Sequence, residues 1–329
     1  MESDPGAPRN AEFSLIDRIR ERAGSRSDVL LGIGDDAAVL QVPEGHQLMV
    51  STDTLVAGVH FPGDTAPADI GWKSLAVNLS DLAAMGATPA WVTLALTLPD
   101  ADVDWLDGFL DGFCELAAEH DVALVGGDTT RGPLSITVGA HGFAPAGVAL
   151  RRDGAGFNDD IWVTGTLGDA AGALRQWQGQ GLMSSKLRYR LDRPTPRIAA
   201  GIALRDLATA AIDLSDGLVA DLGHVLQRSG VGADLDLGRL PTSRILAEHF
   251  PDEHTRWRMQ LSGGDDYELC FTASPAHALA IEQALAACDT PATVVGRITA
   301  GKGLRMTTPD GEQFDAGPRA GFEHFEGTA

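Results

Sequence analysis

The stretch LAVNLSDLAAMGATPAWVTLALTLP, Leu75 to Pro99, contains both kinds of element that build the first half of the chain. Ser74, Asn78 and Asp81 recur at helical spacing, beside an apolar stripe of leucines. We therefore predict a helix over about 69–85. The run WVTLALTLP that follows is apolar and rich in strand-forming residues, and it predicts a buried strand.

Helices and strands alternate on both sides of this stretch. A short helix over about 12–23, a longer one over about 102–119 and several strand-like runs are expected in the first half. The composition changes at 144–160, a Gly-rich and polar segment that is typical of a domain junction. We therefore predict two domains, 1–145 and 146–329, of the α/β or α+β class.

The bulk composition excludes several classes of protein. With 329 residues, 44% of them hydrophobic, the chain has enough apolar material for two ordinary domains. No run approaches the ~18 apolar residues of a membrane helix, and the polar N-terminus lacks the apolar core of a secretory signal. We therefore expect a cytoplasmic protein without a membrane partner. Its net charge of -21 would repel nucleic acid, so we expect no such partner either.

Aspartates gather next to the strand-like runs. The clusters are GIGDDAAV (32–39), STDTLVAGVHF (51–61), NLSDLAAMGA (78–87), GGDTTRG (126–132), IDLSDGL (212–218) and SGGDDYEL (262–269). Loops at strand ends are where binding and catalytic residues concentrate. Any single cluster has an alternative interpretation as an ordinary turn, and Asp216 as the cap of the helix after it. Six clusters in one chain favour a functional site.

The kinds of residue in these clusters favour magnesium chemistry. The chain has no GxxxxGK[ST] loop, no protein-kinase HRD or DFG set and no HExxH. Aspartates around one pocket would repel each other by ~4 kcal/mol per pair at ~4 Å, a cost that protonation or metal binding must relieve. Oxygen ligands without a His/Cys cluster favour Mg²⁺, which completes its shell with water and substrate phosphates.

Asp81 has the most specific local argument. From Leu75 to Pro89 the predicted helix carries no other charge, so we expect most of its surface to be buried. A buried carboxylate is costly unless a cation pairs with it. Few basic residues lie nearby in the sequence, so a metal ion is one candidate and a distant arginine is the alternative.

In this order and spacing the six clusters resemble the thiamine-monophosphate kinase family, part of the aminoimidazole-ribonucleotide synthetase-like superfamily. The resemblance runs from EFSLI at Glu12 to GFEHF at Phe325. It implies an α/β N-terminal domain plus an α+β C-terminal domain. The N-terminal domain would carry the metal and acceptor sites, and its sheet would pair with that of a second subunit to form a barrel in a homodimer. The C-terminal domain would complete the cleft for ATP and the acceptor.

The resemblance also implies a reaction and roles for individual residues. ATP would phosphorylate thiamine monophosphate to thiamine diphosphate, the last step in the biosynthesis of that cofactor. Several Mg²⁺ ions would be held by Asp36, Ser51, Thr52, Asp53, Asp81, Asp128, Asp213 and Asp216, of which Asp53, Asp81, Asp128 and Asp213 form the catalytic set. ATP would contact Gly127, Asp128, Arg152 and Ser215, and the acceptor would contact His60, Asp265 and Phe322.

Two positions depart from the family, and two others have an ordinary alternative. Asp265 stands where the family usually has Glu, and Phe322 where it often has Trp or Tyr. Apart from the resemblance, a lone loop histidine such as His60 is more often a surface residue, and one arginine of an adjacent pair such as Arg151–Arg152 is often solvated. Phe322 retains an aromatic face for stacking but cannot donate a hydrogen bond.

The residues favour direct in-line transfer, because no Ser–His or Cys–His arrangement indicates a covalent intermediate. A phosphate monoester has a second pKa of ~6, so the acceptor needs no strong general base. Two rival functions remain at this point. One is another ATP-using member of the superfamily with a different acceptor. The other is a non-catalytic acidic metal-binding protein, against which the placement of the clusters argues.

Overall fold

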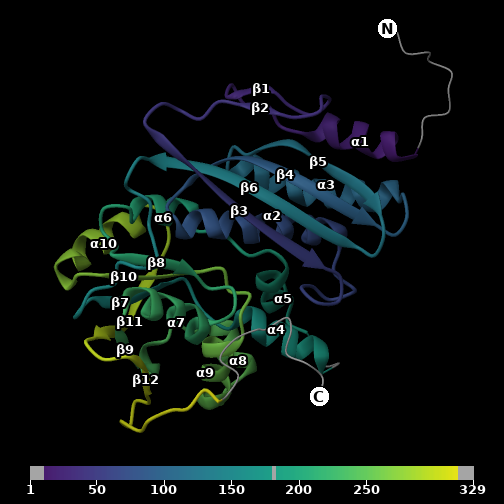
Figure 1. Ribbon diagram of the computed structural model, residues 1–329. Coiled ribbons are helices and arrows are strands. Elements are labelled where there is room, and N and C mark those ends of the chain that lie inside the picture. Colours follow the sequence, from purple (N-terminus) through teal and green to yellow (C-terminus); the bar gives the residue numbers. More distant parts are fainter. Residues whose placement is uncertain (1–10, 180–182, 318–329) are drawn as a thin grey trace, which may run out of the picture. The chain divides into compact units, whose positions relative to one another are not determined.

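The computed structural model describes residues 11–179 and 183–317, which form two compact units (Figure 1). The first unit comprises the described residues up to Asn78 together with Pro89–Phe143. The second comprises Leu79–Thr88 and the described residues from Ala144 onward. Each unit has its own mixed set of helices and strands, which confirms the predicted two-domain architecture.

The first unit is built on a four-stranded sheet with the order β3-β6-β4-β5, in which β4 and β5 are parallel. Its elements are α1 (Ala11–Arg22), β1 (Val29–Leu31), β2 (Val39–Leu40), β3 (His46–Val56), α2 (Pro67–Ala84), β4 (Thr88–Leu98), α3 (Val103–Glu119), β5 (Ala123–Arg131) and β6 (Ser135–Pro145). The helices predicted over 12–23, 69–85 and 102–119 are thereby confirmed. The ends of α2 and β4 nearest each other belong to the second unit.

Strand β4 shows why this sheet has one covered face. Leu94, Leu96 and Leu98 alternate with Thr93 and Ala95, and the three leucines are buried. Alternate side chains point to opposite faces of a strand, so the leucines share one face. In Figure 1, α3 lies along the sheet, and its own buried residues are mostly apolar. One face therefore packs on helices and the other carries small and hydroxyl side chains.

Helices α2 and α3 approach each other closely enough to require glycine. A Cβ on Gly71 would lie 1.9 Å from the backbone oxygen of Phe109, and one on Gly112 would lie 1.8 Å from that of Ala68. No other residue lacks the Cβ, so these two glycines set the spacing of the helices.

The second unit is built on a six-stranded sheet with the order β12-β9-β11-β7-β10-β8. Its elements are β7 (Asp160–Thr164), α4 (Asp169–Gln178), α5 (Ser185–Asp192), α6 (Ile198–Ala203), β8 (Ala210–Asp213), α7 (Leu218–Ser229), β9 (Gly232–Asp236), the 3₁₀ helix η1 (Leu237–Arg239), α8 (Arg244–His249), α9 (Glu253–Ser262), β10 (Leu269–Ala273), the 3₁₀ helix η2 (Pro275–His277), α10 (Ala278–Ala286), β11 (Ala292–Thr299) and β12 (Gly303–Thr307). The described ladders are antiparallel except for β12–β9, which is parallel.

Both faces of this sheet are covered. Ile161 and Val163 of β7 belong to a buried cluster with Leu222 of α7. Trp162, between them in sequence, faces the other side and stacks on Phe271 of β10 at a centroid distance of 5.9 Å. All five residues of β7 are buried, so the sheet forms the interior of a layered α+β unit.

Some expectations concern membrane association and the helix around Asp81. In the described ranges, no helix has the length and apolar character needed to cross a bilayer.

Residues 70–80 of α2 are all buried, as predicted, but Asp81 itself is only partly buried. Lys73, on the same helix, is 1% exposed. A buried cation therefore lies closer to Asp81 in the sequence than we expected.

Candidate active site

The end of strand β8 and two neighbouring loops in the second unit carry four of the predicted site residues. Leu269 of β10 pairs with Asp213 of β8, so residues 214–217 after β8 and residues 263–268 before β10 run side by side. We call these segments the β8 loop and the β10 loop. Three backbone hydrogen bonds of 2.8 Å join them, from Asp265 N to Ser215 O, from Tyr267 N to Leu214 O and from Leu214 N to Glu268 O. Asp213, Ser215, Asp216 and Asp265 therefore lie on one hydrogen-bonded framework.

Asp213 is the most strongly perturbed site carboxyl on this framework. Asp213 is 4% exposed, and the Ser80 hydroxyl donates to its Oδ2 at 2.8 Å. Burial, and next the nearby charge of Asp81, raise the pKa of Asp213 to about 8, while Arg152 acts in the opposite direction. The structure thus brings Asp81 and Arg152 near Asp213 within the second unit. Two close carboxylates without enough positive charge favour a proton or a cation.

Asp221, which sequence reasoning missed, organises the backbone of the β8 loop. It lies in the first turn of α7, and its Oδ2 accepts hydrogen bonds from the N–H groups of Asp216 and Gly217, both at 3.1 Å. Burial, followed by the charge of Asp216, raises the pKa of Asp221 to about 7. Asp221 could not be recognised from the sequence, because acidic residues are common in the first turn of a helix.

Asp265 stands on the β10 loop in an unusual backbone conformation. Its φ is 60° and that of Tyr267 is 50°, both in the left-handed region that non-glycine residues rarely adopt. The Tyr267 hydroxyl donates to Asp265 Oδ1 at 3.0 Å. Asp265 is partly exposed while Asp266, Tyr267 and Glu268 are buried, so its carboxylate is the accessible acid of these four.

Strand β3 holds three predicted metal ligands of the first unit, but not on one face. Ser51 and Asp53 are partly buried, whereas Thr52 between them is exposed and points to the opposite face. The Asp53 N–H donates to Asn78 Oδ1 on α2 at 3.0 Å. Asn78 is one of the three polar residues that recur at helical spacing on α2, and it contacts the strand that carries Asp53. The alternation of side chains along a strand could have indicated from the sequence that Thr52 faces away from Ser51 and Asp53.

Gly127 and Asp128 lie on the exposed half of β5. Gly127 has a φ of 152°, and a Cβ there would lie 1.8 Å from the backbone oxygen of Leu94, so close strand pairing requires glycine. Asp128 pairs in register with Ala95 on the face not covered by helices. It lines a pocket of about 480 Å³ with Leu15, Leu98, Asp100, Ala101, Thr129, Thr130 and Arg131.

The remaining predicted residues are less constrained. Asp36 is exposed and its N–H donates to Asp35 Oδ1 at 2.9 Å. His60 is partly buried, and its Nδ1 accepts from the Val56 N–H at 2.9 Å, which places its ring proton on Nε2. Arg152 is exposed. Phe322 lies outside the described residues.

The predicted metal ligands are divided between the units. Asp36, Ser51, Thr52, Asp53 and Asp128 belong to the first unit, and Asp81, Asp213 and Asp216 belong to the second. Within residues 11–179 and 183–317, no group of three or more His, Cys, Asp or Glu side chains converges to hold a metal ion. The donors are nonetheless all oxygens, and the buried Asp213 has a repulsive neighbour in Asp81. These residues fit Mg²⁺ rather than a thiolate-loving or imidazole-loving metal, and the metal site stays a prediction.

Comparison with known proteins matches both halves of the chain. The family model for the AIR synthase related protein N-terminal domain matches residues 34–144, and the model for the C-terminal domain matches residues 158–308. The thiamine-monophosphate kinase of Escherichia coli K12 is 52% identical over 321 residues, covering 95% of this chain and 98% of the relative.

Solved structures agree with these sequence matches. The crystal structure of thiamine-monophosphate kinase from Stenotrophomonas maltophilia K279a has a TM-score of 0.85 at 55% identity, covering 92% of this chain and 98% of that one. The structure of AaThiL complexed with AMPPCP and TMP has a TM-score of 0.75 at 31% identity, covering 97% and 100% of the two chains.

Proposed function

The chain belongs to the thiamine-monophosphate kinase family, and from this membership we infer that it transfers the terminal phosphoryl group of ATP to thiamine monophosphate. The products are ADP and thiamine diphosphate. The observation that carries this conclusion is 52% identity across 95% of the chain to a thiamine-monophosphate kinase, with no large region left unmatched. A complex of a relative with AMPPCP, which resembles ATP, and TMP supports the same pair of substrates.

The aspartates of both units are proposed to hold several magnesium ions. The set is Asp36, Ser51, Thr52, Asp53, Asp81, Asp128, Asp213 and Asp216. When bound, Mg²⁺ would neutralise the phosphates of donor and acceptor and hold them in line. Support comes from Asp213, whose pKa of about 8 reflects burial beside Asp81 and indicates a place where positive charge is stabilising. Asp53, Asp81, Asp128 and Asp213 are the proposed catalytic carboxylates.

ATP is proposed to contact Gly127, Asp128, Arg152 and Ser215. Gly127 is exposed, and its close pairing with Leu94 fixes the backbone of β5 directly before Asp128. Arg152 is exposed and carries the guanidinium group best suited to a phosphate. Ser215 is held in the β8 loop by its backbone bond to the β10 loop.

The acceptor is proposed to contact His60, Asp265 and Phe322. His60 presents an Nε2–H donor, because its Nδ1 already accepts from the backbone of Val56. Asp265 presents a carboxylate whose Oδ1 is oriented by Tyr267. Its side chain is one methylene shorter than the Glu usual in the family, and the left-handed backbone beneath it fixes its direction.

Direct in-line transfer requires positioning more than proton chemistry. A phosphate monoester is mostly dianionic at neutral pH, since its second pKa is ~6. The acceptor oxygen is therefore already nucleophilic, and the carboxylates serve to place charges and exclude misalignment. No residue needs to act as a strong general base.

A homodimer is also part of the proposal. Strand β3 is at the edge of its sheet, and its Leu48 and Val50 are 46% and 59% exposed. An exposed edge strand with apolar side chains is a surface that a second copy of the sheet would cover. The expected result is a dimer mass in light scattering, reduced to the monomer by Val50→Lys. A cytoplasmic location agrees with the three free thiols Cys114, Cys270 and Cys288.

The activity is tested by incubating the purified protein with MgATP and one of three acceptors: thiamine monophosphate, free thiamine or none. ADP and thiamine diphosphate are both measured by chromatography. We expect thiamine diphosphate only with the monophosphate, in equal amount to ADP, and none in excess EDTA. ADP release without thiamine diphosphate would support the rival superfamily member with another acceptor. No turnover at any magnesium concentration would support a non-catalytic protein.

A further inference from the structure

The β10 loop has an outward side and an inward side. Outward, Tyr267 donates to the partly exposed carboxylate of Asp265. Inward, the side chains of Asp266 and Glu268 are buried, at 4% and 0% exposure. These two buried acids directly follow Asp265, the residue proposed to contact the acceptor. We infer that the inward side anchors the loop.

Glu268 is held from three directions. Arg197 donates to both of its carboxylate oxygens, from Nε and Nη2 at 2.6 Å each. Arg190 donates to Oε1 at 2.9 Å, and the Thr164 hydroxyl donates to Oε2 at 2.8 Å. Bidentate arginine pairs are among the most directional contacts in proteins. The carboxylate packs directly against the backbone of Gly165, where a Cβ would lie 2.1 Å from Oε1, so only glycine fits there.

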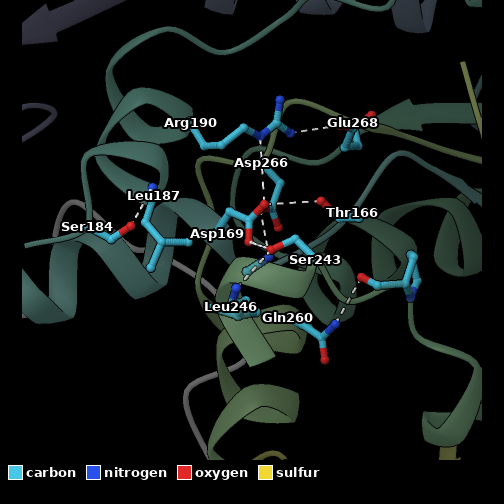
Figure 2. Close-up of polar contacts among 12 residues, drawn as sticks. Thr166, Asp169, Ser184, Leu187, Arg190, Ser243, Leu246, Gln260, Asp266 and Glu268 are labelled. Atoms are coloured by element: carbon cyan, nitrogen blue, oxygen red, sulfur yellow. Dashed lines mark hydrogen bonds and ion pairs between the residues drawn. The ribbon is translucent and has the colours of Figure 1, made fainter. Parts of the chain in front are cut away.

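Charge in this cluster is balanced. Figure 2 shows Arg190 between the carboxylates of Glu268 and Asp169, and the second of these distances is 3.9 Å. Asp266 accepts from the Gly168 N–H at 2.8 Å, and burial raises its pKa well above the usual range. The cations Arg190 and Arg197 thus lie opposite the acids Glu268 and Asp169. We call this cluster of buried acids and partly buried arginines the anchor of the β10 loop.

The anchor lies next to a strained backbone. Asp265 and Tyr267 both have positive φ, and such conformations persist only where surrounding contacts impose them. The backbone bonds to the β8 loop fix the loop on one side, and the bonds of Glu268 fix it on the other. The direction of the Asp265 carboxylate depends on both.

We propose that Glu268, bound by Arg190 and Arg197, is a positioning residue that sets the direction of Asp265 toward the acceptor. Glu268 is 0% exposed, so in this proposal it acts through the loop and not by contact with substrate. This inference rests on the proposed function, because it takes Asp265 as a contact of thiamine monophosphate. A loop that relaxes by about 1 Å would misplace that contact and weaken use of the acceptor by up to ~100-fold.

The test compares Glu268→Gln with Glu282→Gln, the same change at an exposed glutamate on α10. Initial rates are measured while ATP and thiamine monophosphate are varied separately, well below the unfolding temperature of each variant. For Glu268→Gln we expect the KM of the acceptor to rise about tenfold or more, with the KM of ATP changed less than about threefold. Glu282→Gln should match the wild type in both.

A second pair of variants keeps the proposal testable if Glu268→Gln does not fold. Thr164→Val removes the hydroxyl that donates to Glu268 and accepts from the Leu269 N–H, whereas Thr164→Ser retains that hydroxyl. The valine variant should raise the acceptor KM by about threefold to tenfold, and the serine variant should return it toward the wild-type value.

Each outcome has a separate meaning. A lower kcat with both KM values unchanged in these variants would show only a loss of folded enzyme, and would overturn the positioning role. Equal rises in both KM values would also overturn it. Failure of the wild type to form thiamine diphosphate would instead contradict the proposed function, so the two failures are distinguishable in one assay.

Discussion

The β10 loop and strand β5 each present a proposed site aspartate, and they do so in opposite ways. Asp265 stands on a loop whose neighbouring acids are buried, and one of them, Glu268, is bound by two arginines. Asp128 stands on an exposed strand end, where the backbone alone fixes it through pairing with β4. In the first region, our proposal couples function to charge and packing. In the second, we propose that function depends on an exposed carboxylate, and we expect its removal to leave the packing intact.

The largest expected effect separates turnover from stability. Asp128→Asn and Asp213→Asn should each lower kcat/KM by at least ~100-fold, because both remove a proposed ligand. Asp128→Asn should change the free energy of unfolding by less than about 0.5 kcal/mol, since its side chain is exposed. Steady-state rates and urea unfolding of the same preparations provide the measurement. Loss of folding in Asp128→Asn would contradict the contrast between the two regions.

A backbone change sharpens the description of β5. Gly127→Ala should destabilise the protein by about 2–3 kcal/mol, because its φ is 152° and the new Cβ would lie 1.8 Å from Leu94 O. Gly126→Ala is the matched control, since no atom lies within 4 Å of its Cβ. Urea midpoints of the two variants measure the difference. Equal midpoints would mean that β5 does not require its glycine.

The next prediction concerns pH. Burial beside Asp81 raises the pKa of Asp213 from 3.8 to about 8. Between these values the folded protein retains a proton that the unfolded chain has released, so this contribution to stability is full below about pH 4 and is lost as the pH rises to about 8. In EDTA, the stability of Asp213→Asn relative to wild type should therefore increase by about 2–3 kcal/mol from pH 6 to pH 8.

Calorimetry at several pH values measures that difference. Added Mg²⁺ should raise the Tm of the wild type more at pH 8 than at pH 6, because a cation that binds Asp213 competes with its proton. The same addition should have a smaller effect on Asp213→Asn. Parallel pH curves for the two proteins would show that Asp213 is not the group responsible.

The smallest expected effect concerns the outward side of the β10 loop. Tyr267→Phe removes the hydroxyl that donates to Asp265 Oδ1 at 3.0 Å. A single hydrogen bond contributes about 1 kcal/mol, so the acceptor KM should rise by roughly fivefold while the KM of ATP stays constant. Tyr189→Phe, at an exposed tyrosine on α5, is the control. An unchanged acceptor KM would remove Tyr267 from the description of the site.

The fold was largely predictable from local patterns. Periodicity predicted α2 and β4 because their apolar residues repeat at helix and strand spacing. Short helices such as α8 and α9 were not predicted, and neither was β12. Their packing depends on partners distant in sequence, as when Leu246 of α8 packs with Ala173 of α4. Local sequence does not carry such information.

The site was predictable only in part, for a related reason. Asp213 and Asp265 belong to recognisable clusters at strand ends, and the structure joins their loops by backbone hydrogen bonds. Ser80 and Glu268 were missed, although each lies within one of those clusters. Their roles depend on contacts with residues 133 and 71 positions away, in Ser80–Asp213 and Arg197–Glu268. Because the chain contains many acidic residues, the sequence alone could not distinguish a buried acid from a solvated one.

The most direct test of the central claim is a single turnover with ATP labelled in its γ-phosphoryl group. Enzyme in excess over labelled ATP is mixed with Mg²⁺ and thiamine monophosphate and quenched in acid at intervals. Direct transfer predicts that label leaves ATP at the rate at which it appears in thiamine diphosphate, with none bound to protein. Label in inorganic phosphate alone, or in an acid-stable phosphoprotein, would contradict direct transfer to thiamine monophosphate.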